Sequence, residues 1–488
     1  MRERRSSWAL FFLAVFTSLA AAGTPVRQQA ASSELRADLQ QRREALRQKM
    51  GAQSMLILFS APPRLYSNDV SYEFRQNSDF YYLTGIRQAD SRLVLLPGDP
   101  EDREVLFLSE SDPARALWTG EVLTHEEATS ISGIAQVRSV SEFEAFIDSL
   151  LNKSLGQKEE SEVYLLLNGP GLSGTLGREL QFANRIEARF KEARIRNAAP
   201  LIHALRLVKS DYELDQLRSA VDITTEALNR AISLVEPGMW EYQVEAEIEY
   251  IFKKHNSLDW AFPSIVASGR NSTILHHHAN QRQLKAGDLL LMDVGADFNY
   301  YAADVTRTVP VNGSFTPAQA DIYQIVLDAQ KAGISRVKPG SSMAEIQAAA
   351  VKVLKAGLLR LGLITDASEN QYRVFFPHGV SHWMGIDVHD PGSREERLRP
   401  GMVLTVEPGI YVREDALERL SRAGHGAETI NRIRPAVEKY LNIGVRIEDD
   451  LVVTQEGYEL LSGGVPGEME EIVERVGSSS KSQVSSSK

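Results

Sequence analysis

The chain has 488 residues, 43% of them hydrophobic, which is enough for roughly two or three domains with separate cores. Its net charge is −11 and it has no basic block, which argues against nucleic acid or an anionic membrane as a partner. It contains no cysteine, which excludes disulfides, a thiolate nucleophile and thiolate metal ligands. Any catalysis must therefore come from carboxylates, histidines, hydroxyls or a bound metal.

The N-terminus has the pattern of an export signal. Three arginines among the first five residues precede the apolar run 8–22, which ends in small residues and is too short for a comfortable membrane span. We expect residues 1–22 to be a cleaved signal peptide, with a mature chain that begins near Gly23 in the periplasm or outside the cell. An uncleaved anchor is the alternative. Cleavage would remove three arginines and one glutamate, lowering the net charge of −11 by two, and no stable membrane anchor would remain.

The first folded segment alternates between helical and strand patterns. Residues 33–50 have the charge pattern of a helix. Short apolar runs predict strands at 55–59, 92–96, 104–108 and 163–167. Because helical patterns lie between these runs, we expect an α/β N-terminal domain over residues 33–200.

A second unit follows and contains an internal repeat. Apolar residues at helical spacing predict a long helix over 211–235, stopped by the Pro-Gly pair at 237–238. The same succession of helix, Pro-Gly pair and second helix returns 102 residues later, at 339–340. Shared helix-stop chemistry is the alternative explanation. We predict that residues 201–475 form two related halves with a site between them, and that the serine-rich residues 476–488 are a disordered tail.

Two aspartates flank a turn within residues 289–311. Asp293 lies in the first apolar run and Asp304 in the second, around a turn centre predicted at 297–300. If the hairpin folds about that centre, the two side chains face one another on one side of the sheet. Such carboxylates raise each other's pKa unless a cation lies between them, so the pair indicates a metal site. Turn capping is the alternative role for either aspartate alone.

Later segments supply imidazole and further carboxylates. Three histidines fall within residues 378–389, and neutral imidazole can bind a metal or move a proton. Glu407 precedes a turn, and Arg446 and Glu448 share one face of an alternating strand. One imidazole and four carboxylates, with no sulfur, suit a pair of Mn²⁺ or similar divalent ions. Two such ions polarise a carbonyl and activate water, and hydrolysis needs both of these effects. The set therefore predicts a hydrolase.

These motifs resemble those of the metallopeptidases with the pita-bread fold, which include aminopeptidase P, prolidase and methionine aminopeptidase. The segments 74–85 and 205–210 also look like the N-terminal signature and the linker of aminopeptidase P and prolidase. The resemblance implies an α+β pita-bread catalytic domain with pseudo-two-fold halves, preceded by the α/β domain. It implies two divalent metal ions, Mn²⁺ in the first place and Zn²⁺ or Co²⁺ as alternatives. The implied ligands are Asp293, Asp304, His382, Glu407 and Glu448.

The same resemblance assigns the remaining site residues to the substrate. His378 and His389 would hydrogen-bond substrate and stabilise the developing oxyanion, and His276 and Arg446 would help to organise the pocket. Glu407 would move a proton as well as bind metal, because a ligating carboxylate can reach the attacking water. Family members are commonly dimers or tetramers, so a homo-oligomer is expected.

The resemblance implies an Xaa-Pro aminopeptidase acting on peptides with proline at position 2, and the N-terminal signal pattern predicts that it is exported. Prolidase, restricted to dipeptides, is the main alternative, although residues 381–383 (Ser-His-Trp) favour the aminopeptidase pattern over Gly-His-Phe. Methionine aminopeptidase lacks such an N-terminal domain, and the complete ligand set argues against a non-catalytic binding module or a metal-free creatinase-like enzyme. Two features depart from the family pattern: His277, where tyrosine is common, and a long charged connection at 413–440.

Overall fold

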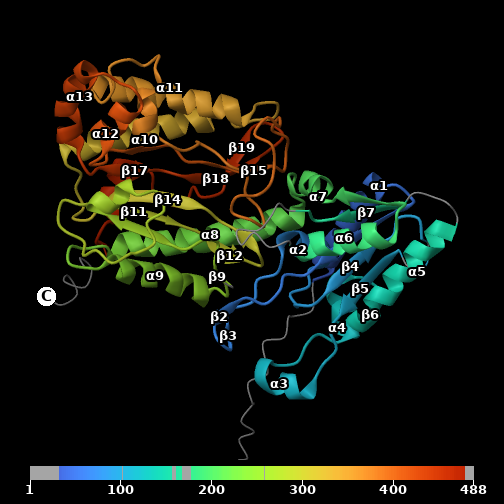
Figure 1. The fold of residues 1–488 in the computed structure, drawn as a ribbon. Coiled ribbons are helices and arrows are strands. Elements are labelled where there is room, and N and C mark those ends of the chain that lie inside the picture. The colour runs from blue at the N-terminus through green and yellow to red at the C-terminus, as the bar shows by residue number, and fades with distance from the viewer. Residues whose placement is uncertain are drawn as a thin grey trace, which may run out of the picture.

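The computed structural model describes residues 32–478 except 100, 102, 157–160, 168–176 and 258. The predicted signal peptide and residues 479–488 of the predicted tail lie outside the described residues. A smaller N-terminal domain, blue to green in Figure 1, lies beside a larger C-terminal domain coloured green to red. Within the described ranges, no helix has the length and apolar character needed to cross a bilayer.

The N-terminal domain is built around a mixed six-stranded sheet with the order β6-β5-β4-β1-β7-β8. β4 is antiparallel to both β1 and β5, and the other neighbouring pairs are parallel. The predicted strands are confirmed as β1, β4, β5 and β7. The strand bounds are β1 Ser54–Phe59, β4 Arg92–Leu95, β5 Glu104–Leu108, β6 Gln136–Ser139, β7 Ser161–Leu165 and β8 Ala193–Asn197.

Alternation along these strands divides the apolar side chains between two cores. Leu56 and Leu58 of β1 belong to a cluster with α1, α2 and α4, whereas Ile57 and Phe59 belong to one with α5 and α6. Helices therefore cover both faces of the sheet, as an α/β domain requires. The helix bounds are α1 Ser33–Lys49, α2 Ser78–Thr84, α4 His125–Ser132, η1 Val140–Glu142, α5 Phe143–Gly156, α6 Arg178–Arg189 and α7 Ala199–Arg206.

Two small elements project from this domain toward the lower edge of Figure 1. One is the hairpin of β2 (Leu65–Ser67) and β3 (Val70–Ser71), and the other is α3 (Pro113–Thr119). Both carry large apolar side chains that are exposed, including Tyr66 and Trp118.

The C-terminal domain consists of two halves of the same construction. Each half has a helix pair, α8–α9 or α10–α11, followed by a three-stranded sheet, β10-β11-β14 or β15-β18-β19. At the repeated Pro-Gly pairs, the amides of Gly238 and Gly340 donate to the carbonyls of Leu284 and Leu398, each at 2.9 Å. Both glycines have positive φ, 99° and 85°, which explains why glycine stands at each position. The predicted internal repeat is confirmed. The bounds are α8 Asp211–Leu234, α9 Glu241–Lys254, β10 Ile265–Ser268, β11 Leu289–Val294, β14 Val305–Pro310, α10 Pro317–Ile334, α11 Met343–Leu361, β15 Val403–Val406, β18 Asp449–Val453 and β19 Tyr458–Leu460.

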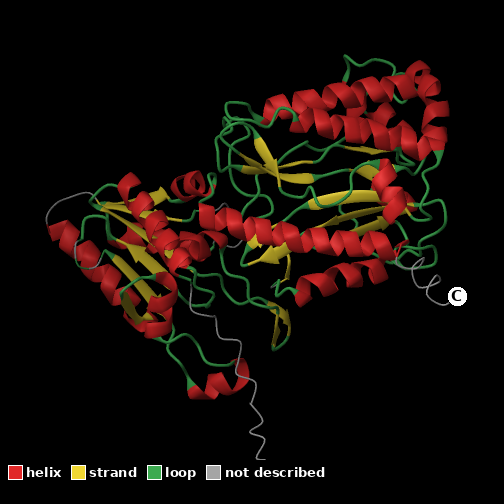
Figure 2. Ribbon diagram, turned by 180° about the vertical axis from the view of Figure 1, so that it is seen from behind, coloured by secondary structure: helices red, strands yellow, loops and turns green. Residues whose placement is uncertain are grey.

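The strands of the two halves form a middle layer. Figures 1 and 2 show α8 and α9 on one side of it and α10 and α11 on the other. Val476, assigned from sequence to the tail, is buried in the core of this domain. The remaining bounds are β9 Asp259–Trp260, η2 Gly269–Thr273, β12 Ala296–Phe298, β13 Tyr301–Ala302, η3 Asn370–Val374, β16 Gly409–Tyr411, α12 Ala416–Arg422, α13 Ala427–Tyr440, β17 Gly444–Arg446 and α14 Met469–Arg475.

The hairpin that carries the two aspartates has a different register from the one predicted. Asp293 pairs with Thr306, and Asp304 lies just before β14. The tight turn is at Asn299 and Tyr300, with φ of 50° and 73°, so its centre comes one residue later than predicted and every partner shifts by two. The expectation that the two aspartates lie directly opposite one another is therefore wrong. A shift of two keeps both on the same face of the hairpin.

The N-terminal domain contacts the turn of this hairpin. Tyr81 stacks on Tyr300 with ring centroids 4.0 Å apart, and the amide of Gln76 donates to the Tyr300 hydroxyl at 2.9 Å. Arg42 donates to the Tyr301 hydroxyl at 3.1 Å. The domain interface thus fixes the end of the element that brings two candidate metal ligands into the site.

Candidate active site

A cavity of about 690 Å³ lies within the C-terminal domain. All nine site residues predicted from the sequence line this one cavity: His276, Asp293, Asp304, His378, His382, His389, Glu407, Arg446 and Glu448. Their placement together is an observation, whereas their individual roles remain predictions.

The pseudo-symmetry explains why four carboxylates meet. In the first half, Asp293 lies near the end of β11 and Asp304 just before its partner β14. In the second half, Glu407 follows β15 and Glu448 precedes its partner β18. Each antiparallel pair therefore contributes two carboxylates from one end, and the two ends converge on the cavity.

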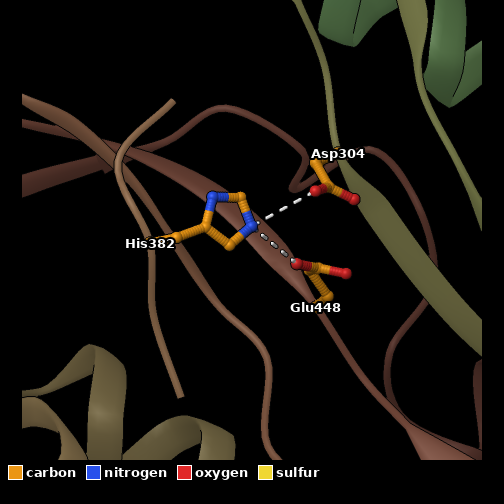
Figure 3. Close-up of side chains that lie close together, drawn as sticks. All are labelled: Asp304, His382 and Glu448. Carbon is orange, nitrogen blue, oxygen red and sulfur yellow. Dashed lines mark ion pairs between the residues drawn. The ribbon is translucent and has the colours of Figure 1, made fainter. Parts of the chain in front are cut away.

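His382 is at the centre of the tightest group. Its Nε2 lies 3.3 Å from Oδ2 of Asp304, 3.9 Å from Oε1 of Glu448 and 4.0 Å from Oε1 of Glu407. Figure 3 shows the imidazole pointing between the carboxylates of Asp304 and Glu448, and candidate ligand atoms of these three residues lie within 4.8 Å of one another. The His382 Nδ1 is 3.0 Å from the carbonyl of Trp383, an N–H donor geometry that leaves Nε2 available to a metal.

Asp293 is joined to this group through Arg446. Its Oδ2 forms an ion pair with the guanidinium of Arg446, and its buried Oδ1 has no hydrogen-bond partner among the described residues. Arg446 Nε donates to the Thr306 hydroxyl at 3.1 Å, which donates in turn to Glu448 at 2.6 Å. Arg446 and Thr306 therefore orient carboxylates from both halves of the domain.

The electrostatics of the group fit bound cations. Burial raises the pKa of Asp304 well above its usual value, and the charges of Asp293, Asp450 and Glu407 raise it further. Burial and the charge of Asp304 likewise raise the pKa of Glu448. Divalent cations would offset the repulsion between these carboxylates and could be coordinated by Oδ1 of Asp293, which has no hydrogen-bond partner among the described residues. The donor set, rich in oxygen and holding one imidazole, suits two such ions.

Two further histidines contact the ligand group. His378 Nδ1 lies 3.4 Å from Glu407, and its Nε2 is 2.9 Å from the Tyr411 hydroxyl. The ring of His389 meets that of His382 edge to face at 4.4 Å. Burial lowers the pKa of His389 and the nearby His382 lowers it further, which favours the neutral imidazole.

The sequence reasoning missed several residues that line the cavity or complete its network. His278 is the third member of a run of three histidines, which was an available signal, and its ring lies 6.1 Å from that of His276. Ser381, which lies between His378 and His382, and Arg394, which follows the three histidines, also line the cavity. Tyr411 accepts a hydrogen bond from Arg446 at 2.9 Å, and only the pairing of β16 with β17 brings the two together.

The two departures from the family pattern have structural explanations. His277 is buried outside the cavity and is hydrogen-bonded to Glu241 at 3.1 Å and near Asn271 at 3.3 Å. Residues 413–440 form α12 and α13, which pack against η3 and α10. Among the described residues that line the cavity, none comes from this connection.

Comparison with known proteins gives consistent matches over both domains. Residues 215–455 match the model of metallopeptidase family M24, and residues 39–158 match that of the aminopeptidase P N-terminal domain. The chain is 36% identical to the Xaa-Pro aminopeptidase of Escherichia coli K12, over 90% of this chain and 97% of that protein. It is 32% identical to human Xaa-Pro aminopeptidase 3, over 86% of this chain and 80% of that protein.

Solved structures agree with the predicted fold. Aminopeptidase PepP of Pseudomonas aeruginosa has a TM-score of 0.80 and 35% identity, covering 92% of this chain and 99% of that one. Aminopeptidase P from E. coli with the inhibitor Pro-Leu has a TM-score of 0.79 and 35% identity, covering 93% and 100%. The predicted pita-bread fold with an α/β N-terminal domain is confirmed. Metallopeptidases of this family act on peptides. Membership of the family implies that divalent metal ions are bound, and a candidate metal site is present. The chain belongs to the Xaa-Pro aminopeptidase family of M24 metallopeptidases and is a metallo-aminopeptidase.

Proposed function

We propose that the chain is a dinuclear-metal exopeptidase that hydrolyses the bond between an N-terminal residue and a following proline. The observation that carries this proposal is the convergence of four carboxylates and the His382 imidazole, with four further histidines, in one cavity. The relative from E. coli was solved with the inhibitor Pro-Leu, which supports a site adapted to proline at the residue after the scissile bond.

Five side chains would hold the two ions: Asp293, Asp304, His382, Glu407 and Glu448. When bound, such ions polarise a carbonyl oxygen and lower the pKa of a water molecule. Mn²⁺ is the proposed metal, because oxygen ligands dominate the donor set. Elemental analysis of protein reconstituted with Mn²⁺ should give close to two ions per chain, and no bound metal after reconstitution would contradict the proposal.

The residues of the chain supply the proton transfers and hydrogen bonds. Burial acts to raise the pKa of Glu407, but the hydrogen bond from His378 and the adjacent imidazoles hold it below its usual value. The ionised carboxylate is therefore able to accept a proton from the attacking water. Neutral His389 would donate to the oxyanion that develops on the scissile carbonyl, and His378, held by Tyr411, would hydrogen-bond the substrate.

Peptide length distinguishes the proposed activity from that of prolidase. Purified, Mn²⁺-loaded protein should hydrolyse Xaa-Pro-Yaa tripeptides with a higher kcat/KM than Xaa-Pro dipeptides. Cleavage of dipeptides alone would identify a prolidase instead, and cleavage of neither would contradict the exopeptidase assignment.

We also propose that the protein is exported and is a homo-oligomer. The export proposal is supported by the arginines and apolar run of the first 22 residues, and N-terminal sequencing from the native host should find a start near Gly23. An intact Met1 on a cytosolic protein would contradict it. The oligomer is supported by Leu117 and Trp118 on α3, whose exposed fractions of 83% and 85% are typical of an interface rather than a free surface.

A further inference from the structure

A buried charge cluster lies behind residues 378–390 of the active site, which carry three histidines and are called the histidine segment below. Arg206, the last residue of α7, donates from Nη2 to Asp390 at 2.5 Å and to Asp387 at 2.6 Å, and from Nη1 to Asp79 at 2.7 Å. Lys209 Nζ holds the second Asp390 oxygen at 3.1 Å. The side chains of Arg206, Lys209 and Asp390 are only 3%, 1% and 1% exposed.

Neither cation of this cluster lines the catalytic cavity, so neither can touch substrate there. Asp390 follows His389 in the chain, and its backbone amide donates at 2.9 Å to the carbonyl of Trp383, the neighbour of His382. The carboxylate and the backbone of Asp390 are therefore both held, while the ring of His389 lies against that of His382. Fixing Asp390 at these points restricts the position of His389.

Burial of this cluster is poorly explained by stability alone. A buried ion pair gains little over well-packed apolar side chains, since desolvation of the charges offsets their attraction. A guanidinium fork that contacts three carboxylates does, however, impose a defined geometry on the segments it joins. Those segments are α2, through Asp79, and the histidine segment, through Asp387 and Asp390.

We propose that Asp390, clamped by Arg206 and Lys209, is a positioning residue that sets His389 for the reaction. Asp79 ties the clamp to α2, a second element of the N-terminal domain, and the Ser78 hydroxyl reinforces it by donating to Asp387 at 2.6 Å. None of the described residues that line the cavity belongs to the N-terminal domain, so this domain takes part in catalysis through the position of His389. This inference rests on the role of His389 given under the proposed function.

A double-mutant cycle tests this inference on full-length, metal-loaded protein. Asp390→Asn should lower kcat on an Xaa-Pro-Yaa tripeptide by about 10- to 100-fold, with KM and metal content nearly unchanged, because small displacements of a catalytic group are costly. In a His389→Ala background the same substitution should lower kcat less than about twofold, because its effect passes through His389. Equal losses in both backgrounds, or a near-normal kcat for Asp390→Asn, would overturn the inference.

A matched control separates positioning from general loss of a buried charge. Glu104→Gln removes the carboxylate that pairs at 2.9 Å with buried Arg43 in the N-terminal domain, and kcat should stay within about twofold of wild type. If Asp390→Asn does not fold, Asp387→Asn replaces it, because that side chain is 40% exposed. Asp387→Asn should show a smaller loss of kcat with the same dependence on His389, and an additive loss would count against positioning.

A spectroscopic measurement keeps this test independent of the proposed function. The NMR signal of the His389 imidazole ring is identified by its absence in His389→Ala. It should shift or broaden in Asp390→Asn and stay in place in Glu104→Gln. An unmoved signal would overturn the positioning role. Failure of wild-type protein to cleave any Xaa-Pro-Yaa peptide would instead contradict the proposed function, and the His389 signal would still decide the positioning.

Discussion

His389 shows how environment sets the role of a single residue. It lies beside the candidate ligand His382 in the cavity, and burial lowers its pKa, which favours the neutral imidazole. A neutral imidazole carries an N–H that can donate to an oxyanion without bringing an extra positive charge next to bound cations. His382, in contrast, has its Nδ1–H occupied by a backbone carbonyl and presents Nε2 to the carboxylates.

We predict that His389→Ala lowers kcat on an Xaa-Pro-Yaa peptide by about 10²–10³-fold, because one oxyanion donor is lost. Metal content should stay near that of wild type, since His389 is not among the proposed ligands. The measurements are steady-state kinetics and elemental analysis, with His125→Ala, at the exposed first position of α4, as the control. A metal-replete variant with near-normal kcat and a lowered melting temperature would show that His389 serves only to hold the fold together.

At the scale of elements, α9 organises the segment that carries His276. Glu241, in the first turn of α9, is fully buried and accepts from the amide of Ser268 at 2.7 Å, the amide of Arg282 at 2.9 Å and His277 at 3.1 Å. Burial acts to raise the pKa of Glu241, but these hydrogen bonds outweigh it and lower the pKa from 4.5 to about 2.

This shift predicts a specific loss of stability in acid. The folded pKa lies below the unfolded value, so ionised Glu241 stabilises the fold above pH 4.5, and that contribution is lost as the pH falls toward about 2. Glu241→Gln should lower the free energy of unfolding at pH 7 by about 2–3 kcal/mol, and by less at pH 3. Urea unfolding at both pH values measures this, with Glu247→Gln as the control, because that α9 side chain is 36% exposed and its ion pair with Arg230 lies at the surface. The same loss at both pH values would contradict the assignment.

The aspartate hairpin depends on a close backbone approach at Gly295. A Cβ at this position would lie 1.7 Å from the carbonyl oxygen of Ala303, which belongs to the opposite strand and adjoins Asp304. Because that oxygen is backbone, the two strands would have to separate, and the separation would occur between the ligands Asp293 and Asp304.

We therefore predict that Gly295→Ala weakens metal binding by about tenfold or more, because the ligand geometry is disturbed. Titration of apo-protein with Mn²⁺ measures the change. Gly457→Ala, where an added Cβ meets nothing within 4 Å, is the control and should bind metal normally. Normal metal affinity in Gly295→Ala would show that the hairpin adapts without moving its carboxylates.

At the scale of the whole molecule, the two domains act on one site while α3 extends away from both. α3 and the β2–β3 hairpin project on the same side in Figure 1. Both carry exposed apolar side chains: Leu117 and Trp118 on α3, and Leu65 and Tyr66, each 66% exposed, on β2. Covering exposed apolar surface of this kind with another chain removes it from water and stabilises the assembly of the two chains.

We predict that the protein sediments as a homo-oligomer and that Leu117→Ser combined with Trp118→Ser shifts it toward single chains. Loss of two large apolar side chains from an interface weakens association by about 2 kcal/mol or more. Sedimentation velocity measures the shift, and Tyr250→Ser, which removes an exposed aromatic on α9, is the control. A wild-type protein that sediments as a single chain at micromolar concentration would contradict the oligomer.

The sequence by itself determined the local elements and the chemistry of the site. Apolar periodicity predicted β1 and α8 because each depends on neighbours within a few residues. The candidate ligands could be assigned as a set because the segments that carry them resemble those of a known metallopeptidase family, whereas Glu407 alone gives no such signal. The repeated Pro-Gly pair predicted the two halves because a helix stop is also a local signal.

Tertiary structure decided what depends on residues distant in the chain. A turn centred one residue later than predicted moved the partner of Asp293 to Thr306, because turn geometry and strand pairing settle register together. Arg206 and Asp390 are separated by 184 positions, and only the docking of the two domains brings them into contact. No local pattern marks such a pair, since its energy arises from burial and charge that exist only in the assembled fold.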